Sequence, residues 1–164
     1  MLASESARVT HEQAITILKN AGKEWEFKPE YGQDIAKEHE KYLTEEYFHS
    51  PVFVTDWPKD IKCFYMKQNP DGKTVAAVDY LVPGAGEMMG GSQREEDYGK
   101  LVAEMKRRNM NIDELYWYVN LRKFGTCKHS GFGMGFERML MYLTGIDNIR
   151  DVLPFPRTPG NCSF

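Results

Sequence analysis

Residues Gly131–Leu143 of this 164-residue chain read GFGMGFERMLMYL, a glycine-rich stretch that passes into an apolar helical pattern. Backbone N–H groups and the dipole at a helix N-terminus favour an anion at such a place. Arg138, in the first turn, adds positive charge, and its plane can stack on a purine. The glycine spacing matches neither a dinucleotide fingerprint nor a P-loop, so a nucleotide site and a glycine-rich packing turn both stay open.

The helix that follows these glycines has one apolar stripe. Phe136, Met139, Leu140 and Leu143 recur at i, i+3, i+4 and i+7, which predicts that this face is buried. Arg138 lies off the stripe.

The middle of the chain has the short, β-branched runs typical of strands. A turn at 69–72 predicts an antiparallel hairpin between the runs on either side of it, and 83–86 forms a second turn. Strands are predicted over 51–56, 63–67 and 74–82, with a further strand that begins near Glu87.

Helices are predicted on both sides of these strands. The first is capped by Thr10 and ended by Gly22. The order of helices, then strands, then helices predicts an α+β fold, an antiparallel sheet flanked by helices. The predicted helices cover 12–19, 33–48 with Ile35, Tyr42, Leu43 and Phe48 buried, 95–108, and 113–123 with Tyr116, Trp117 and Tyr118 favoured as core packing.

Composition limits the class of protein. Apolar residues make up 41% and charged residues 27%, as in ordinary globular domains, and the length suits one domain. A net charge of −3 argues against a stand-alone nucleic-acid-binding domain. No membrane span or signal peptide is expected. The scattered Cys63, Cys127 and Cys162 lack zinc-site spacing and suggest a reducing compartment.

Two carboxylates flank the predicted turn at 83–86. Asp79 stands inside an otherwise apolar strand, where a charge is costly unless it is hydrogen-bonded or bound to a cation. Glu87 follows the turn, so the two could face each other across a hairpin and hold Mg²⁺ with substrate phosphates. A satisfied structural aspartate is the alternative, and from these residues alone it is favoured.

Arg94 lies an odd number of positions after Glu87, which places the two side chains on opposite faces of a regular strand. They share a site only where the strand bulges or ends, and Gly90–Gly91 permits that. Arg94 could then bind a carboxylate or carbonyl with its planar fork, although a surface arginine beside a turn is the simpler interpretation.

Together, these segments resemble class II aminoacyl-tRNA synthetases of the asparaginyl type. GFER at 135–138 resembles motif 3, and GEMMGGSQRE at 86–95 resembles the amino-acid-binding strand of the aspartyl, asparaginyl and lysyl subgroup. The resemblance runs from about Arg8 to Phe164. Three further stretches carry it: WPKDIKCFYM at 57–66, DGKTVAA at 71–77 and DVLPFPR at 151–157.

The resemblance implies roles for nine residues. Arg138 and Glu87 would be catalytic, with Arg138 gripping ATP. Mg²⁺ would be held by Glu87 with Asp79 in support, although Gly90 stands where aspartyl relatives use a hydroxyl near the metal. The remaining residues would line the pockets: Gly135, Phe136 and Glu137 for ATP, and Arg94, Gly90 and Gly91 for the amino acid.

The resemblance also implies a reaction. Asparagine would be activated with ATP as asparaginyl-adenylate and then transferred to tRNA(Asn), in a cytoplasmic homodimer. Residues 1–164 would be the C-terminal part of the catalytic domain, with motifs 1 and 2 and the anticodon-binding domain absent, so the isolated chain is expected to be inactive. The alternatives are a non-catalytic binding or assembly module, or an aspartyl-type relative.

Overall fold

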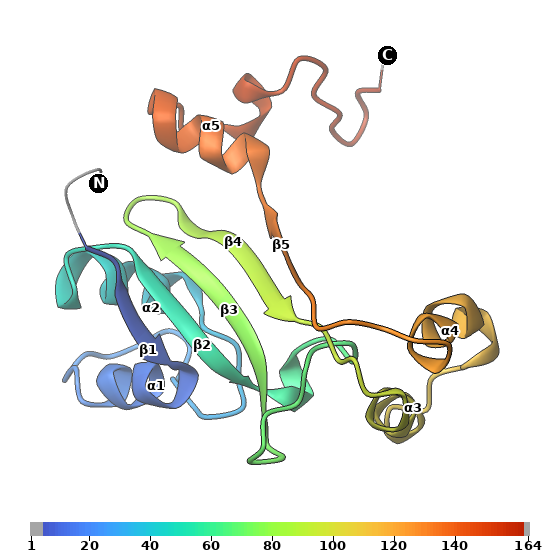
Figure 1. Ribbon diagram of the computed structural model, residues 1–164. Helices are drawn as coiled ribbons and strands as arrows, with labels where there is room; N and C mark the ends of the chain where they lie inside the picture. Colours follow the sequence, from blue (N-terminus) through green and yellow to red (C-terminus); the bar gives the residue numbers. More distant parts are fainter. Residues whose placement is uncertain (1–4, 163–164) are drawn as a thin grey trace.

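A five-stranded sheet in the order β1-β2-β3-β4-β5 forms the centre of the computed structural model, which describes residues 5–162 (Figure 1). β1 runs parallel to β2, and every other neighbouring pair is antiparallel. The predicted α+β class is confirmed, but the two short edge strands, β1 and β5, were missed. The strands are β1 Ala7–Thr10, β2 Val52–Pro58, β3 Thr74–Val82, β4 Gly86–Gln93 and β5 Ser130–Met134.

The helices before β5 gather at two places beside the sheet, and α5 stands apart from both. Figure 1 shows α1 and α2 beside β1 and β2, and α3 with α4 at the far end of β4. Within residues 5–162, no helix is both long and apolar enough to cross a membrane. The α-helices are α1 His11–Lys19, α2 Lys37–Lys41, α3 Tyr98–Arg107, α4 Tyr116–Lys123 and α5 Phe136–Thr144; η1 Tyr42–Tyr47 is a π-helix, and η2 Lys59–Ile61, η3 Asp113–Leu115 and η4 Ile149–Val152 are 3₁₀ turns.

The main core lies between α1 and one face of the sheet. Thr10 begins α1 as predicted, through a capping box. The Thr10 hydroxyl accepts a hydrogen bond from the Gln13 backbone N–H, and the Gln13 side-chain oxygen accepts one from the Thr10 backbone N–H. Removal of the apolar core side chains from water drives the packing of α1 against the sheet. The fully buried members include Ala14 and Leu18 of α1, Val52 and Val54 of β2, and Leu43 of η1.

The predicted helix over 33–48 begins later than expected, at Lys37, and becomes a π-helix after Lys41. His39 explains part of this, because it is buried and ties the preceding chain to the helix. Its Nδ1 accepts from Ala36 N at 3.2 Å, and its Nε2 donates to Phe27 O at 2.8 Å. Ile35 and Leu43 are buried as predicted, whereas Tyr42 and Phe48 are only half-buried.

The predicted hairpin between 63–67 and 74–82 forms only next to its turn. Asn69 N donates to Thr74 O and Ala76 N donates to Lys67 O, on either side of the antiparallel bridge of Gln68 with Val75. No strand forms over 63–67, and β3 pairs with β2 and β4 along the rest of its length. The turn residues are suitable, but the sheet already supplies β3 with two longer partners.

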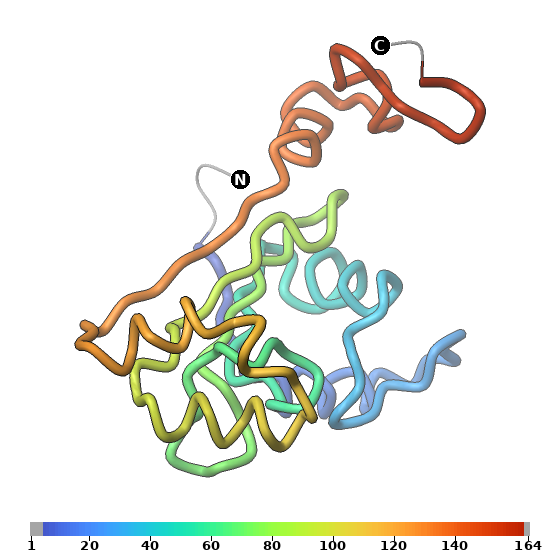
Figure 2. Tube along the Cα trace, turned by 90° about the vertical axis from the view of Figure 1, so that its right-hand side faces the viewer, coloured from blue at the N-terminus to red at the C-terminus, as the bar shows by residue number. Residues whose placement is uncertain are grey.

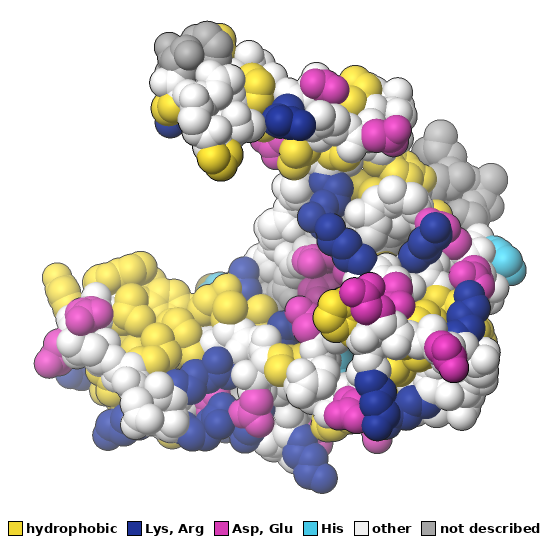
Figure 3. Space-filling view, turned by 180° about the vertical axis from the view of Figure 1, so that it is seen from behind, with side chains coloured by type: hydrophobic (Ala, Val, Ile, Leu, Met, Phe, Trp, Pro, Cys, Tyr) yellow, Lys and Arg dark blue, Asp and Glu magenta, His cyan; other side chains and the backbone are white. Residues whose placement is uncertain are grey.

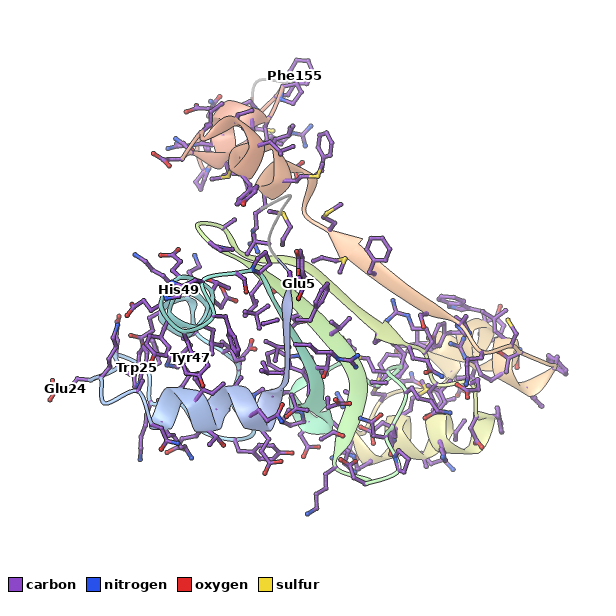
Figure 4. The ribbon with its side chains drawn as sticks, turned by 60° about the vertical axis from the view of Figure 1, so that its left-hand side comes forward. Glu5, Glu24, Trp25, Tyr47, His49 and Phe155 are labelled. Atoms are coloured by element: carbon purple, nitrogen blue, oxygen red, sulfur yellow. The ribbon has the colours of Figure 1, made fainter. Side chains whose placement is uncertain are left out.

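The last part of the chain stands away from the sheet (Figure 2). No residue of α5 is buried, and Phe136 and Leu143 are 60% and 69% exposed, so the predicted buried stripe is wrong. Phe155 lies still farther out in this arm (Figure 4). We call residues 135–162 the C-terminal arm.

The aromatic cluster of α4 divides in two. Tyr118 packs beside Phe64 and Tyr65, with ring centroids 6.0 and 6.5 Å away. Tyr116 and Trp117, by contrast, are 63% and 54% exposed, so the prediction of core packing fails for these two. Figure 3 shows a continuous apolar area over this end of the molecule, below a hollow that the C-terminal arm overhangs.

These exposed surfaces predict self-association. β5 has one strand neighbour among the described residues, and Phe132 on it is 69% exposed, so an apolar strand edge is open to another chain. Light scattering should show a molar mass that rises with concentration, and Phe132→Lys should reduce that rise. A monodisperse monomer at the highest concentration would count against this prediction.

Glu104 on α3 predicts a pH-dependent stability. Hydrogen bonds from Arg107 and Arg108 lower the pKa of this buried carboxyl to about 2. Its stabilising effect is therefore complete above the ordinary value of 4.5 and is lost as the pH falls through about 2. Glu104→Gln should lower the unfolding free energy by about 1–3 kcal/mol at neutral pH. This loss of unfolding free energy should become smaller as the pH falls toward about 2.

Urea denaturation over this pH range measures the effect. Glu24→Gln is the control, because Glu24 projects into solvent (Figure 4). A deficit for Glu104→Gln that does not change with pH would contradict the assignment.

Candidate functional site

A β-bulge at Met88 sets the geometry of strand β4. Tyr80 pairs with Met89 and Leu81 pairs with Glu87, so Met88 has no residue opposite it on β3. The extra residue reverses the alternation of side chains. Glu87 therefore points to the same face of the sheet as Gly90, Ser92 and, beyond the strand end, Arg94. The sequence predicted a bulge at Gly90–Gly91, and the structure has it two residues earlier.

Asp79 lies next to Gly90 on this face and is buried. Its Oδ2 is 2.6 Å from Nζ of Lys62, which itself lies 3.7 Å from the centre of the Trp57 ring. Burial raises the pKa of Asp79, and the neighbouring Lys62 opposes that rise. Asp79 is therefore paired with Lys62 through Oδ2, while its Oδ1 is directed toward Gly90.

The free oxygens of Asp79 and Glu87 meet at Gly90. A Cβ built on Gly90 would lie 2.8 Å from Glu87 Oε1 and 3.3 Å from Asp79 Oδ1. The missing side chain thus leaves a small space between two hard oxygen donors, which we call the Gly90 notch.

The donor set of the Gly90 notch fits Mg²⁺, which binds through one or two carboxylates together with water and substrate phosphates. Within residues 5–162, no group of three or more histidine, cysteine, aspartate and glutamate side chains could hold a metal ion. A cation here would thus depend on ligands from the substrate.

Arg94 lies at the other end of β4. Its guanidinium is 4.9 Å from the centre of the Tyr65 ring and bonds to Ser92 Oγ. A Cβ on Gly131 of β5 would lie 3.0 Å from Arg94 Nη2, so the glycine lets the side chain lie flat against that strand. Arg94 is held in one orientation by three neighbours, as a binding arginine requires.

Arg138 connects the C-terminal arm to β4. Its Nη1 donates to the backbone carbonyl of Glu87, while Gly135 N donates to Met88 O at 3.2 Å. The start of α5 thus docks on the bulge itself. Phe136 is exposed and Glu137 half-buried beside this junction.

A cleft of about 1090 Å³ opens between the end of the β3–β4 hairpin, the α2–η1 helix and α5. Glu87 and Arg138 line it, and so does Glu40 of α2. Its volume is that of a pocket for a sizeable ligand. Asp79, Gly90 and Arg94 are not part of its lining; they continue the site along β4.

Glu40 was missed in the sequence because nothing local distinguishes it from the other charges of this helix. Burial raises its pKa to about 7, and the Glu87 carboxylate raises it as well. A hydrogen bond from the Glu87 backbone N–H and the charge of Arg138 act in the opposite direction. Only the folded chain shows this proximity.

Most of the predicted site residues therefore form two connected groups, and Arg94 lies apart from them at the other end of β4. Glu87, Arg138 and residues 135–137 meet at the bulge, and Glu87, Asp79 and Gly90 share the notch. Gly91 pairs with Phe132 of β5, and its Cβ position is filled by that strand, so it admits no ligand on that side.

Comparison with known proteins identifies relatives of this arrangement. A sequence profile described as tRNA synthetases class II (D, K and N) matches residues 2–159. The asparagine–tRNA ligase of Acholeplasma laidlawii is 57% identical over 164 residues, which cover 100% of this chain and 35% of that protein. The chain thus spans about a third of the length of the curated relatives it matches.

Solved structures agree on the fold. Entamoeba histolytica asparaginyl-tRNA synthetase in complex with asparaginyl-adenylate superposes with a TM-score of 0.89 at 38% identity, over 98% of this chain and 37% of that one. Aspartyl-tRNA synthetase from the same organism gives 0.83 at 28% identity, over 95% and 32%. The chain is more similar to the asparaginyl enzyme than to the aspartyl enzyme.

The close approach of β5 to β4 predicts different costs at two glycines. A Cβ on Gly91 would lie 2.9 Å from the Gly131 carbonyl oxygen, a backbone atom that cannot swing aside, whereas one on Gly133 would meet nothing within 4 Å. Gly91→Ala should lower the unfolding free energy by about 1–3 kcal/mol. Gly133→Ala should change it by about 0.5 kcal/mol or less. Urea denaturation checks both, and equal costs would contradict the register of β5.

Proposed function

Because this chain belongs to the class II tRNA synthetases of the aspartate, lysine and asparagine group, we propose that it contributes the motif 3 part of an asparagine–tRNA ligase. The enzyme would activate asparagine with ATP and transfer it to tRNA(Asn). Residues 1–164 would form the C-terminal part of the catalytic domain, working in the cytoplasm as part of a homodimer.

One observation carries this proposal: Arg138 and Glu87 meet at the bulge, where the arginine donates to the Glu87 carbonyl. A cation and an anion are thereby fixed beside one cleft, with the N-terminus of α5 next to them. This set of charges suits a triphosphate, whose oxygens bind arginine while a carboxylate shares a divalent cation with them.

ATP would bind at this junction. Arg138 would contact a phosphate and cover the adenine, with Gly135, Phe136 and Glu137 lining the same pocket. Glu87 and Asp79 would hold Mg²⁺ in the Gly90 notch. Mg²⁺ bound there would neutralise phosphate charge and favour departure of pyrophosphate.

Asparagine would bind farther along β4, toward Arg94. Glu87 and Arg94 are seven positions apart, roughly 20 Å along a strand. A single amino acid is too short to reach from Glu87 to Arg94. An amino acid joined to a nucleotide is long enough to lie along the strand between these two side chains. Gly90 keeps the strip between them low, whereas the Cβ position of Gly91 points to β5, so only the backbone of Gly91 could line the amino acid.

The chemistry needs no protein nucleophile. A carboxylate oxygen of asparagine attacks the α-phosphorus of ATP, and the bond to the bridging oxygen breaks to release pyrophosphate. A terminal ribose hydroxyl of tRNA then attacks the carbonyl carbon of asparaginyl-adenylate, and AMP leaves. Arg94 and Arg138 would align the reactants and balance the charge on the phosphorus.

The exposure of the site explains why the isolated chain is expected to be inactive. Phe136 is 60% exposed, and no residue of α5 is buried, so water reaches the junction freely. Charge stabilisation is weak in such a high dielectric. A closed site would be recovered when these residues replace the matching third of a longer relative.

The test is asparagine-dependent exchange of pyrophosphate into ATP by the Acholeplasma laidlawii ligase carrying residues 1–164 in place of its own segment. This chimera should exchange with asparagine and not with aspartate, and Arg138→Ala should lower kcat/KM for ATP about 100-fold or more, an effect of the size lost with one fixed charge contact.

Three results would contradict the proposal. Exchange that prefers aspartate would favour an aspartyl-type relative. ATP binding that is unchanged by Arg138→Ala would favour a non-catalytic module. Strong exchange by the isolated chain would contradict the need for a closed site.

A further inference from the structure

The β3–β4 turn is held from outside by two carboxylates of the α2–η1 helix. Glu45 Oε1 accepts from Gly84 N at 2.9 Å. Glu40 reaches the same turn: its Oε2 lies against Gly86, and the backbone N–H of Glu87, three residues past Gly84, stabilises its carboxylate. The two glutamates are five positions apart, and the π-helical stretch between them, with i→i+5 bonding, helps direct both toward one turn.

Gly86 shows how closely Glu40 approaches the turn. Its φ is +70°, and a Cβ added there would collide with Glu40 Oε2. The backbone conformation therefore favours glycine, and a Cβ at this position would displace the Glu40 carboxylate. The contact is specific to position 86, because a Cβ on Gly84 in the same turn would meet nothing within 4 Å.

The turn itself supplies little rigidity. Gly84 and Gly86 both have positive φ, and glycine has the largest conformational freedom of any residue. The position of Glu87 therefore depends on the contacts of its own backbone N–H and C=O groups. Its N–H interacts with the Glu40 carboxylate and its C=O accepts from Arg138, one on each side of the Cα that bears the carboxylate.

We propose that Glu40 is a positioning residue that fixes the Glu87 backbone, and through it the Glu87 carboxylate and Arg138, for the binding of the ATP phosphates. The proposal rests on the function proposed above. Glu40 lines the cleft beside both residues, and its carboxyl group interacts with the charge of Arg138, so it lies next to the pair that it would position.

The first test is amide hydrogen exchange in this chain, followed by NMR. Glu40→Ala should speed exchange of the Glu87 amide about tenfold or more, because its acceptor is lost. Glu45→Ala is the matched control, because it removes the other carboxylate that contacts the β3–β4 turn. It should speed exchange of the Gly84 amide and leave the Glu87 amide unchanged.

Conservative variants separate position from charge. Glu40→Gln keeps an acceptor at the same reach and should hold the Glu87 amide near its original rate. Glu40→Asp keeps the charge but is one methylene shorter, so it should behave like Glu40→Ala and gives the same information if the alanine variant does not fold.

The second test is kinetic and uses the chimera described above. Glu40→Ala should lower kcat/KM for ATP about tenfold while the KM for asparagine stays within about twofold, since only the phosphate side moves. Glu40→Gln should restore most of the loss, and Glu45→Ala should change neither parameter by more than about threefold.

The proposal is overturned if the Glu87 amide exchanges at its original rate in both Glu40→Ala and Glu40→Asp. It is also overturned if Glu45→Ala lowers kcat/KM for ATP as much as Glu40→Ala does, since the turn as a whole would then be responsible. A chimera without asparagine-dependent pyrophosphate exchange would instead contradict the proposed function. The amide hydrogen exchange of this chain would still test whether Glu40 fixes the Glu87 backbone.

Discussion

The extra residue at Met88 shifts the pairing of β4 against β3 by one position, and most of the candidate site follows from that shift. Without it, Glu87 would face away from Asp79 and Arg94. The bulge also frees two carbonyls at the strand edge, one taken by Gly135 N and the other by Arg138. One backbone irregularity therefore orients a carboxylate and anchors the helix that carries the arginine.

The second constraint is the burial of charge beside the core. Asp79 stands among apolar residues of β3 and is balanced by Lys62, which packs on Trp57. Glu40 is half-buried beside Glu87 in the cleft. Each carboxylate has a partner, and these partners leave the oxygens that face the Gly90 notch without a competing side chain. The geometry agrees with a site that receives a cation together with its substrate.

Sequence predicted those features that depend on local pattern. The cap at Thr10, the strands β2, β3 and β4 and the motif residues Glu87 and Arg138 all follow from short stretches. Three features depend on distant partners and were missed or misplaced: the length of the hairpin around 69–72, the π-helix after Lys41 and the contact of Glu40 with Glu87. The apolar stripe of α5 was identified correctly as a pattern, but its burial requires a surface that the described residues do not provide.

The most direct measurement is a crystal structure of the Acholeplasma laidlawii chimera with a non-hydrolysable sulfamoyl analogue of asparaginyl-adenylate. We expect the adenine against Arg138, the sulfamoyl group beside Glu87 and the asparagine side chain within hydrogen-bonding distance of the Arg94 end of β4. An analogue bound with its amino acid end away from Arg94, or with its adenine outside the junction of Arg138 and Glu87, would contradict this expectation.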